Sequence, residues 1–153
     1  MQCHHAEYRG TDRQRDTYFV VPEGRLKLRE GNIENALIFY LRDDQHNPKK
    51  SRVMLAPVSD IAPLKEILSI LFDVLAVVNK EREIYYIGNV KFHLDRIADL
   101  GTFVEIEAID NTDNRSDDEL MAQCRRYMEI LNIHEVDLLK GSYSDMQQDL
   151  GSV

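Results

Sequence analysis

The sequence predicts an α+β domain built on an antiparallel β-sheet. Short segments rich in β-branched and aromatic residues recur along the chain, and turn signals such as Gly31-Asn32 and Gly88-Asn89 separate them at hairpin spacing. A nearly continuous apolar segment over residues 64–76 has the length and composition of a helix. The predicted architecture is therefore two groups of strands, about seven in all, divided by a helix.

The first group of strands precedes residue 60. Strand signals begin at Asp16, and the predicted strands cover 17–21, 25–29, 36–42 and 51–56. Residues 1–13 are polar, and we expect them to form a disordered N-terminal segment. Residues 14–153 then form a single domain, as the length of 153 residues suggests.

The second group of strands follows the helix. Asp60 suits the N-cap of that helix, and Pro63 suits its first turn. Strand signals then cover 77–86, 90–95 and 102–109, and Ser116 with Glu119 forms the capping-box pattern of a second, amphipathic helix. Because the helix at 64–76 is apolar nearly all round, it is predicted to be buried or to lie at an interface.

The composition excludes several classes of protein. A net charge of −8 argues against a general nucleic-acid binder or a binder of anionic membranes. The sequence predicts no secretory leader and no membrane span, and its two cysteines do not make a disulfide framework. A cytoplasmic protein is the expectation.

One face of the predicted strands collects basic side chains, while the other face is aliphatic. A charged face of an antiparallel sheet is most often simply solvated. Here, however, cations and carboxylates segregate onto different strands, and two like charges about 5 Å apart repel by roughly 3 kcal/mol at an effective dielectric of about 20. The face therefore predicts a polyanionic ligand. Its basic residues are Arg25, Lys27, Arg29, Arg42, Lys80, Arg82 and Lys91.

On the later strands, carboxylates occupy the alternate positions that face the same side as the basic residues. Glu105 and Glu107 alternate on one strand, and Asp95 lies on the strand before it. Carboxylate oxygens are the ligands that Mg²⁺ and Mn²⁺ prefer. We therefore predict that Asp95, Glu105 and Glu107 bind a divalent cation that bridges to phosphate oxygens.

An ordered set of motifs extends from Gln14 to Asp145. In chain order the motifs are Gln14–Phe19, Gly24–Glu30, Leu37–Arg42, Lys80–Arg82, His93–Asp95, Leu100–Glu107 and Gly141–Asp145. Together they resemble the CYTH domain, or triphosphate tunnel metalloenzyme family, and in particular its class IV adenylyl cyclase-like branch.

The resemblance implies an antiparallel β-barrel that encloses a tunnel, with helices packed outside. It implies that inward basic residues grip a triphosphate and that inward carboxylates hold Mg²⁺ or Mn²⁺. Carried over, the phosphate-binding residues are Lys27, Arg29, Arg42, Lys80 and Arg82, with Arg25 and Lys91 as further candidates, and the metal ligands are Asp95, Glu105 and Glu107. Homodimers are common in the family, and the apolar helix at 64–76 is compatible with one.

The sequence departs from the family pattern in one respect. The family's Glu-x-Glu-x-Lys motif on the first strand has no counterpart among residues 1–13, so the barrel is expected to be one strand short. Three functions stay open: conversion of ATP to cyclic AMP and pyrophosphate, hydrolysis of inorganic or thiamine triphosphate, and binding of a triphosphate without turnover. Catalysis depends on the missing strand being supplied.

Overall fold

Among the residues that the structure describes, seven strands and two helices follow one another in the predicted order. The computed structural model describes residues 5–42, 51–110, 114–134 and 137–138. The elements are β1 (Glu7–Phe19), β2 (Arg25–Glu30), β3 (Ala36–Arg42), β4 (Ser51–Pro57), α1 (Ile61–Leu71), β5 (Val74–Ile87), β6 (Val90–Ile97), β7 (Gly101–Ala108) and α2 (Asp117–Ile130).

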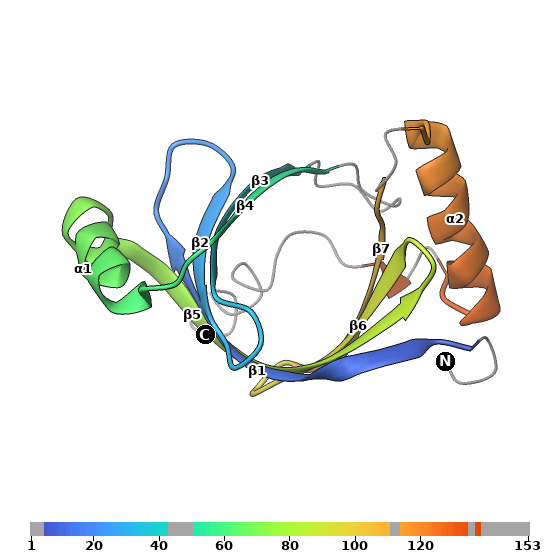
Figure 1. Cartoon of the computed structure of the whole chain (residues 1–153), viewed down its shortest axis with the longest axis horizontal. Coiled ribbons are helices and arrows are strands. Elements are labelled where there is room, and N and C mark those ends of the chain that lie inside the picture. Colours follow the sequence, from blue (N-terminus) through green and yellow to red (C-terminus); the bar gives the residue numbers. More distant parts are fainter. Residues whose placement is uncertain (1–4, 43–50, 111–113, 135–136, 139–153) are drawn as a thin grey trace.

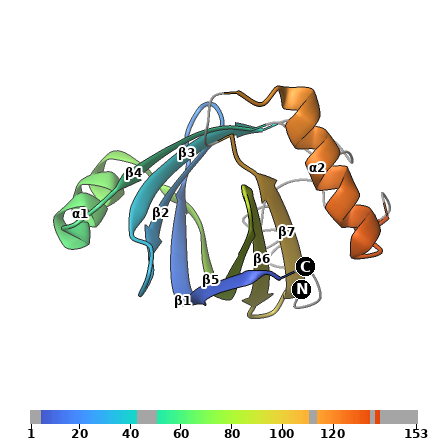
Figure 2. The same ribbon diagram turned by 45° about the vertical axis from the view of Figure 1, so that its right-hand side comes forward.

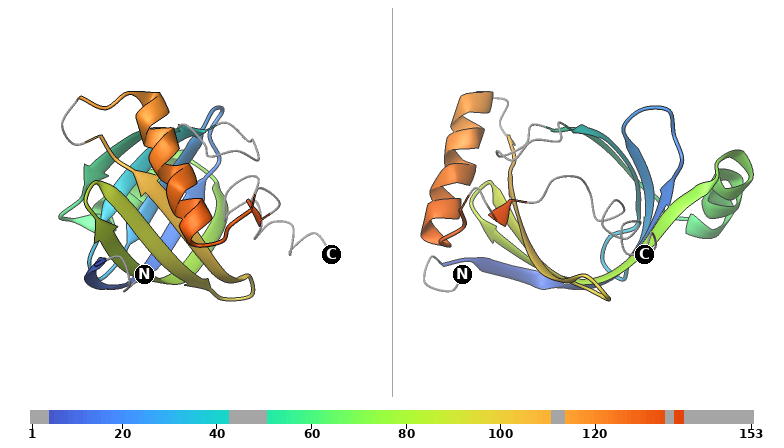
Figure 3. Two further views of the ribbon diagram at one scale, coloured as in Figure 1. Left: turned by 90° about the vertical axis from the view of Figure 1, so that its right-hand side faces the viewer. Right: turned by 180° about the vertical axis from the view of Figure 1, so that it is seen from behind.

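All strands belong to one antiparallel sheet of order β4-β3-β2-β1-β5-β6-β7. The sheet curls into a half-barrel with β4 and β7 at its two edges (Figure 1), and a second view shows the same trough obliquely (Figure 2). Both helices lie on the outside of the curl (Figure 3). The predicted fold, an antiparallel barrel-like sheet with external helices, is confirmed.

Strand β1 begins at Glu7, whereas the sequence predicted a strand only from Asp16. The strand pairs with β5 over its whole length, from Glu7 opposite Tyr86 to Phe19 opposite Val74. Residues 7–13, which were expected to be disordered, are therefore part of the sheet. Their side chains are polar on both faces, so the strand state comes from pairing with β5 and leaves no local hydrophobic signal.

Helix α1 ends at Leu71, five residues earlier than predicted. Phe72 already has an extended backbone, and the carbonyl of Asp73 accepts a hydrogen bond from the backbone N–H of Val20. From Val74 onward the chain is strand β5. The β-branched residues that follow Asp73 favour a strand, because they fit a pleated, half-buried surface.

The packing of the two helices identifies the outer face of the sheet. Leu28 of β2 is fully buried in a cluster with Phe19 of β1 and Leu68 of α1. On the other side of the half-barrel, Phe92 of β6 makes an edge-on ring contact with Tyr127 of α2, with centroids 5.0 Å apart. The capping box predicted for α2 is present, with Ser116 and Glu119 each bonded to the other's backbone N–H.

Helix α1 is buried on one side only. Leu68 is buried, whereas Ile67, Ile70 and Leu71 are 51%, 77% and 67% exposed. Within the part of the chain that the structure describes, no helix is long and apolar enough to cross a membrane.

We expect Leu28→Ala to lower the free energy of unfolding by about 2–5 kcal/mol, because it leaves a cavity between β2 and α1. Urea denaturation measures the change. Ile70→Ala, on the exposed side of α1, is the control and is expected to cost less than about 1 kcal/mol. Equal losses in the two variants would show that α1 does not pack on Leu28.

Candidate functional site

The predicted charged face is the inner, concave face of the half-barrel. Leu28 and Phe92 point outward to the helices, so their neighbours in sequence, such as Lys27 and His93, point inward. Residues opposite each other in adjacent strands share a face, and the register places Arg82 opposite both Asp12 and Asp95. The basic and acidic residues predicted from alternation are therefore on one surface.

Strand β1 adds two carboxylates to this surface that the sequence prediction missed. Asp12 and Asp16 are both 0% exposed, and Gln14 between them is 4% exposed. The alternation Asp12-x-Gln14-x-Asp16-x-Tyr18 was the signal, but its first half precedes the predicted start of the strand. The excess of positive charge on the inner face is consequently smaller than the sequence suggested.

Asp16 is the centre of a basic cluster, by which we mean Lys27, Arg29 and Lys80. Arg29 donates from Nε to Oδ1 at 2.9 Å and from Nη2 to Oδ2 at 2.8 Å. Lys80 Nζ donates to Oδ2 at 2.9 Å, and Lys27 Nζ lies 3.5 Å from the same oxygen. Burial tends to raise the pKa of Asp16, but the three cations hold it well below its usual range. The carboxylate is therefore ionised.

Arg29 has a second anionic partner in the turn between β2 and β3. Its Nη1 donates to Glu34 Oε1 at 2.7 Å. That turn is held by Asp12, whose oxygens accept from the backbone N–H groups of Ile33 and Glu34 at 2.9 and 3.1 Å. Two carboxylates thus fix the guanidinium of Arg29.

Lys27 lies between two aromatic rings. Its Nζ is 5.5 Å from the ring centroids of both Tyr18 and Tyr40. Burial, together with Lys80 and Arg29, lowers the pKa of Lys27 to about 7, against the opposing effect of Asp16. At neutral pH the charge of this lysine therefore responds to any anion that approaches it.

A second group of charges lies on β5, β6 and β7. Arg82 makes a bidentate pair with Asp95, with Nε and Nη2 each 2.7 Å from a carboxylate oxygen. The same Nη2 is 3.3 Å from Oε2 of Glu105. Arg82 and Asp95 are both buried, so this pair lies in a low-dielectric setting where losing either partner is costly.

Glu105 also contacts His93, whose Nδ1 lies 3.2 Å from Oε2. Burial acts to raise the pKa of Glu105, but Arg82, His93 and Lys80 hold it well below its ordinary range. Burial, with Arg82 and Lys91, lowers the pKa of His93 to about 4. At neutral pH Glu105 is therefore a carboxylate and His93 is an uncharged imidazole.

The predicted metal ligands differ in their availability. Glu105 and Glu107 alternate on β7, the side chain of Glu105 is 42% exposed, and Glu107 is exposed. Asp95 is 0% exposed, and both of its oxygens accept from Arg82. Among the described residues, no group of three or more His, Cys, Asp and Glu side chains is arranged to hold a metal ion. The two glutamates carry the oxygen donors that a hard divalent cation prefers, while Asp95 is engaged by Arg82.

The remaining predicted residues lie around these two groups. Arg25 is at the start of β2 and donates to the carbonyl of Gly24 at 3.2 Å. Lys91 is opposite Glu107, and its Nζ is 5.8 Å from the ring centroid of Tyr86. Arg42 is the last residue of β3, and its side chain lies outside the described part of the structure.

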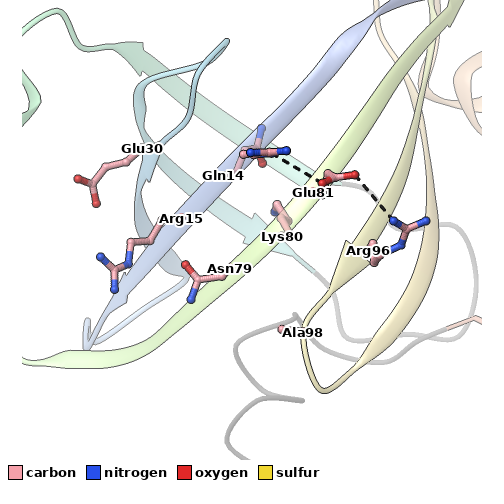
Figure 4. A pocket seen from close by; sticks show the side chains of 9 residues that line it. Gln14, Arg15, Glu30, Asn79, Lys80, Glu81, Arg96 and Ala98 are labelled. Atoms are coloured by element: carbon pink, nitrogen blue, oxygen red, sulfur yellow. Dashed lines mark ion pairs between the residues drawn. The ribbon is translucent and has the colours of Figure 1, made fainter.

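An open groove of about 490 Å³ lies on the opposite, convex face (Figure 4). Glu81 lies between two arginines, with Oε2 3.8 Å from Arg13 Nε and Oε1 3.8 Å from Arg96 Nη1. The side chains of Arg13 and Arg96 are 85% and 77% exposed. Such a cross-strand ladder of exposed ion pairs is typical of a solvated sheet surface. The convex groove is therefore a weaker candidate for a site than the buried charges of the inner face.

The sequence matches the CYTH domain over residues 5–143, which is most of the chain. The chain belongs to the CYTH domain family. CYTH proteins are metal-dependent triphosphate tunnel proteins. No curated protein matches the sequence at a significant level.

Solved structures share the fold of this CYTH domain. The PH1012 protein from Pyrococcus horikoshii is 26% identical, with a TM-score of 0.83 over 94% of this chain and 87% of that one. A conserved hypothetical protein from Pyrococcus furiosus is 24% identical, with a TM-score of 0.81 over the same shares. A Vibrio parahaemolyticus protein proposed to be an adenylate cyclase is 17% identical, with a TM-score of 0.72 over 94% of this chain and 84% of that one.

We expect Asp95→Leu to lower the free energy of unfolding by about 3–5 kcal/mol, because it leaves Arg82 buried without its bidentate partner. Adding Arg82→Met is expected to recover much of that loss, since neither charge of the bidentate pair then remains, and Glu105 keeps its contact with His93 and its exposure to solvent. Denaturant titration of both variants measures the effect.

Glu81→Gln is the matched control, because it breaks only the exposed ion pairs of the convex face and is expected to change stability by less than about 1 kcal/mol. A loss from Asp95→Leu no larger than that of the control would contradict a strongly coupled buried pair.

Proposed function

We propose that the inner face binds a nucleoside triphosphate together with Mg²⁺ or Mn²⁺, and that this CYTH domain converts ATP to cyclic AMP and pyrophosphate. The observation that carries the proposal is the basic cluster around Asp16. Three cations, all nearly buried, share one carboxylate, and Lys27 and Lys80 both approach the same oxygen. The cluster concentrates positive charge around one carboxylate, so it is suited to a multiply charged anion.

The separation of charge along the inner face supports a ligand with a bound metal. The basic cluster lies on β2 and β5 around β1, and Glu105 and Glu107 lie on β7. Arg82 stands between them, paired with Asp95 and close to Glu105. A triphosphate that spans this surface places some phosphates at Lys27 and Lys80 and others beside the glutamates.

The residues would promote the reaction by positioning and by charge neutralisation. Lys27 and Lys80 neutralise phosphate oxygens, and Arg82 keeps Glu105 in place. Glu105 and Glu107 would hold the cation, which supplies Lewis-acid polarisation of the phosphate oxygens when bound. In cyclisation, the ribose 3′-hydroxyl attacks the α-phosphate and pyrophosphate leaves.

Two related functions share this surface. Hydrolysis of inorganic or thiamine triphosphate uses the same contacts, with water as the nucleophile. Binding without turnover is favoured by one observation, which is that Asp95 gives both oxygens to Arg82 and leaves only two accessible carboxylates among the predicted ligands. The identity of the nucleophile distinguishes cyclisation from hydrolysis. The availability of Asp95 as a metal ligand distinguishes catalysis from binding alone.

An activity panel tests the proposal. The purified protein is incubated with ATP, inorganic triphosphate or thiamine triphosphate and with Mg²⁺ or Mn²⁺, and the products are separated. Cyclic AMP is the expected product, and Glu105→Gln combined with Glu107→Gln is expected to abolish its formation because the metal ligands are lost. Released phosphate would instead indicate a triphosphatase. Binding without product would indicate a binding module, and the absence of binding would contradict the proposal.

We expect Lys27→Ala to weaken the binding of inorganic triphosphate at least tenfold, or about 1.4 kcal/mol, and to change the binding of phosphate much less. The reason is that Lys27 balances the additional charge of the longer anion. Calorimetry with both anions measures the ratio, and Arg13→Ala on the convex face is the control. Equal losses for the two anions would indicate that Lys27 is not part of a triphosphate site.

A further inference from the structure

Asp16 is the residue at which three proposed phosphate-binding cations meet, yet a carboxylate is a poor ligand for an anion. It is 0% exposed and comes from β1, whereas its partners come from β2 and β5. Lys80 is 64 residues away in the sequence. A buried charge in the wall of a site for anions therefore calls for a reason other than direct contact with the ligand.

We propose that Asp16 is a positioning residue of the triphosphate site, which holds Lys27, Arg29 and Lys80 aligned and charged before the ligand arrives. The inference rests on the proposed function of the inner face and adds a residue that acts through the cations. It concerns the binding of the triphosphate and not the metal or the reaction that follows.

Asp16 holds the three cations with different numbers of contacts and at different distances. Arg29 is fixed by two hydrogen bonds to Asp16 and by a third to Glu34. Lys80, whose side chain is 0% exposed, has its Nζ 2.9 Å from Asp16 Oδ2. Lys27 is the least tightly held, at 3.5 Å with 11% of its side chain exposed. A ligand can therefore draw Lys27 away while Asp16 keeps the other two in place.

Asp16 also opposes the loss of the proton from Lys27. The charged and titratable groups that face Lys27 are Asp16 and Tyr18 of β1, Arg29 of β2, Tyr40 of β3, and Lys80 and Arg82 of β5. Among the charged groups of this set, Asp16 favours the charged lysine, while the neighbouring cations and burial favour the neutral form. Removing the Asp16 charge therefore lowers the pKa of Lys27, and the lysine becomes neutral at a lower pH.

Asp12 provides a matched control on the same strand. It lies on the same face four residues away and is equally buried at 0% exposure. Its oxygens accept from two backbone N–H groups and from the side-chain amide of Gln14, and not from the basic cluster. Asp12→Asn and Asp16→Asn both remove a buried carboxylate charge, but only the second removes it from the cations.

Calorimetric binding of inorganic triphosphate from pH 5 to pH 9, in EDTA so that no metal contributes, tests the proposal. In the native protein the affinity is expected to decline as the pH rises through the range in which Lys27 loses its proton. Asp16→Asn is expected to move the midpoint of that decline down by at least about one pH unit, equivalent to about tenfold weaker binding on the falling limb. Asp12→Asn is expected to keep the native midpoint, and the ionisation of the ligand is the same for all three proteins.

The role of Asp16 is overturned if Asp16→Asn keeps the native pH midpoint of the affinity decline, or if Asp12→Asn shifts that midpoint by the same amount. Either result leaves the proposed function intact. A native protein that does not bind triphosphate at any pH would overturn both. If Asp16→Asn does not fold, the same substitution is made together with Lys80→Met and compared with Lys80→Met alone. The same displacement is then expected, and its absence overturns the proposal.

Discussion

The site depends on the requirement that a buried charge must be paired. Asp16 lies in the wall of the half-barrel with no exposure to solvent, and it is stable there as a carboxylate because cations from two neighbouring strands converge on it. The same requirement binds Arg82 to Asp95 on the other side of β5. These ion pairs connect four adjacent strands, so the electrostatics of the site and the pairing order of the sheet depend on each other.

The curl of the sheet gives these charges one surface to share. Aliphatic and aromatic residues on the convex face pack under the two helices. The polar residues that alternate with them along each strand therefore lie on the concave face. The basic cluster and the two glutamates of β7 then lie on different strands of one trough. Membership of the CYTH family gives this arrangement its context, since triphosphates are the ligands of that family.

Alternation along the strands was enough to predict the inner face. Lys27, Arg82 and Glu105 lie on one surface because the side-chain period of a strand is two residues whatever its neighbours are. The partners of these residues could not be predicted, because Asp16 meets Lys80 only when β1 is placed beside β5. The polar first half of β1 was missed for the same reason, since pairing with β5 and not local hydrophobicity makes it a strand.

The most direct test of the account is a crystal structure of the protein grown with inorganic triphosphate and Mn²⁺, with the metal located by its anomalous scattering. The account predicts phosphate density against Lys27 and Lys80 and a manganese peak at Glu105 and Glu107. Triphosphate bound instead among the arginines of the convex groove, with an empty inner face, would contradict it.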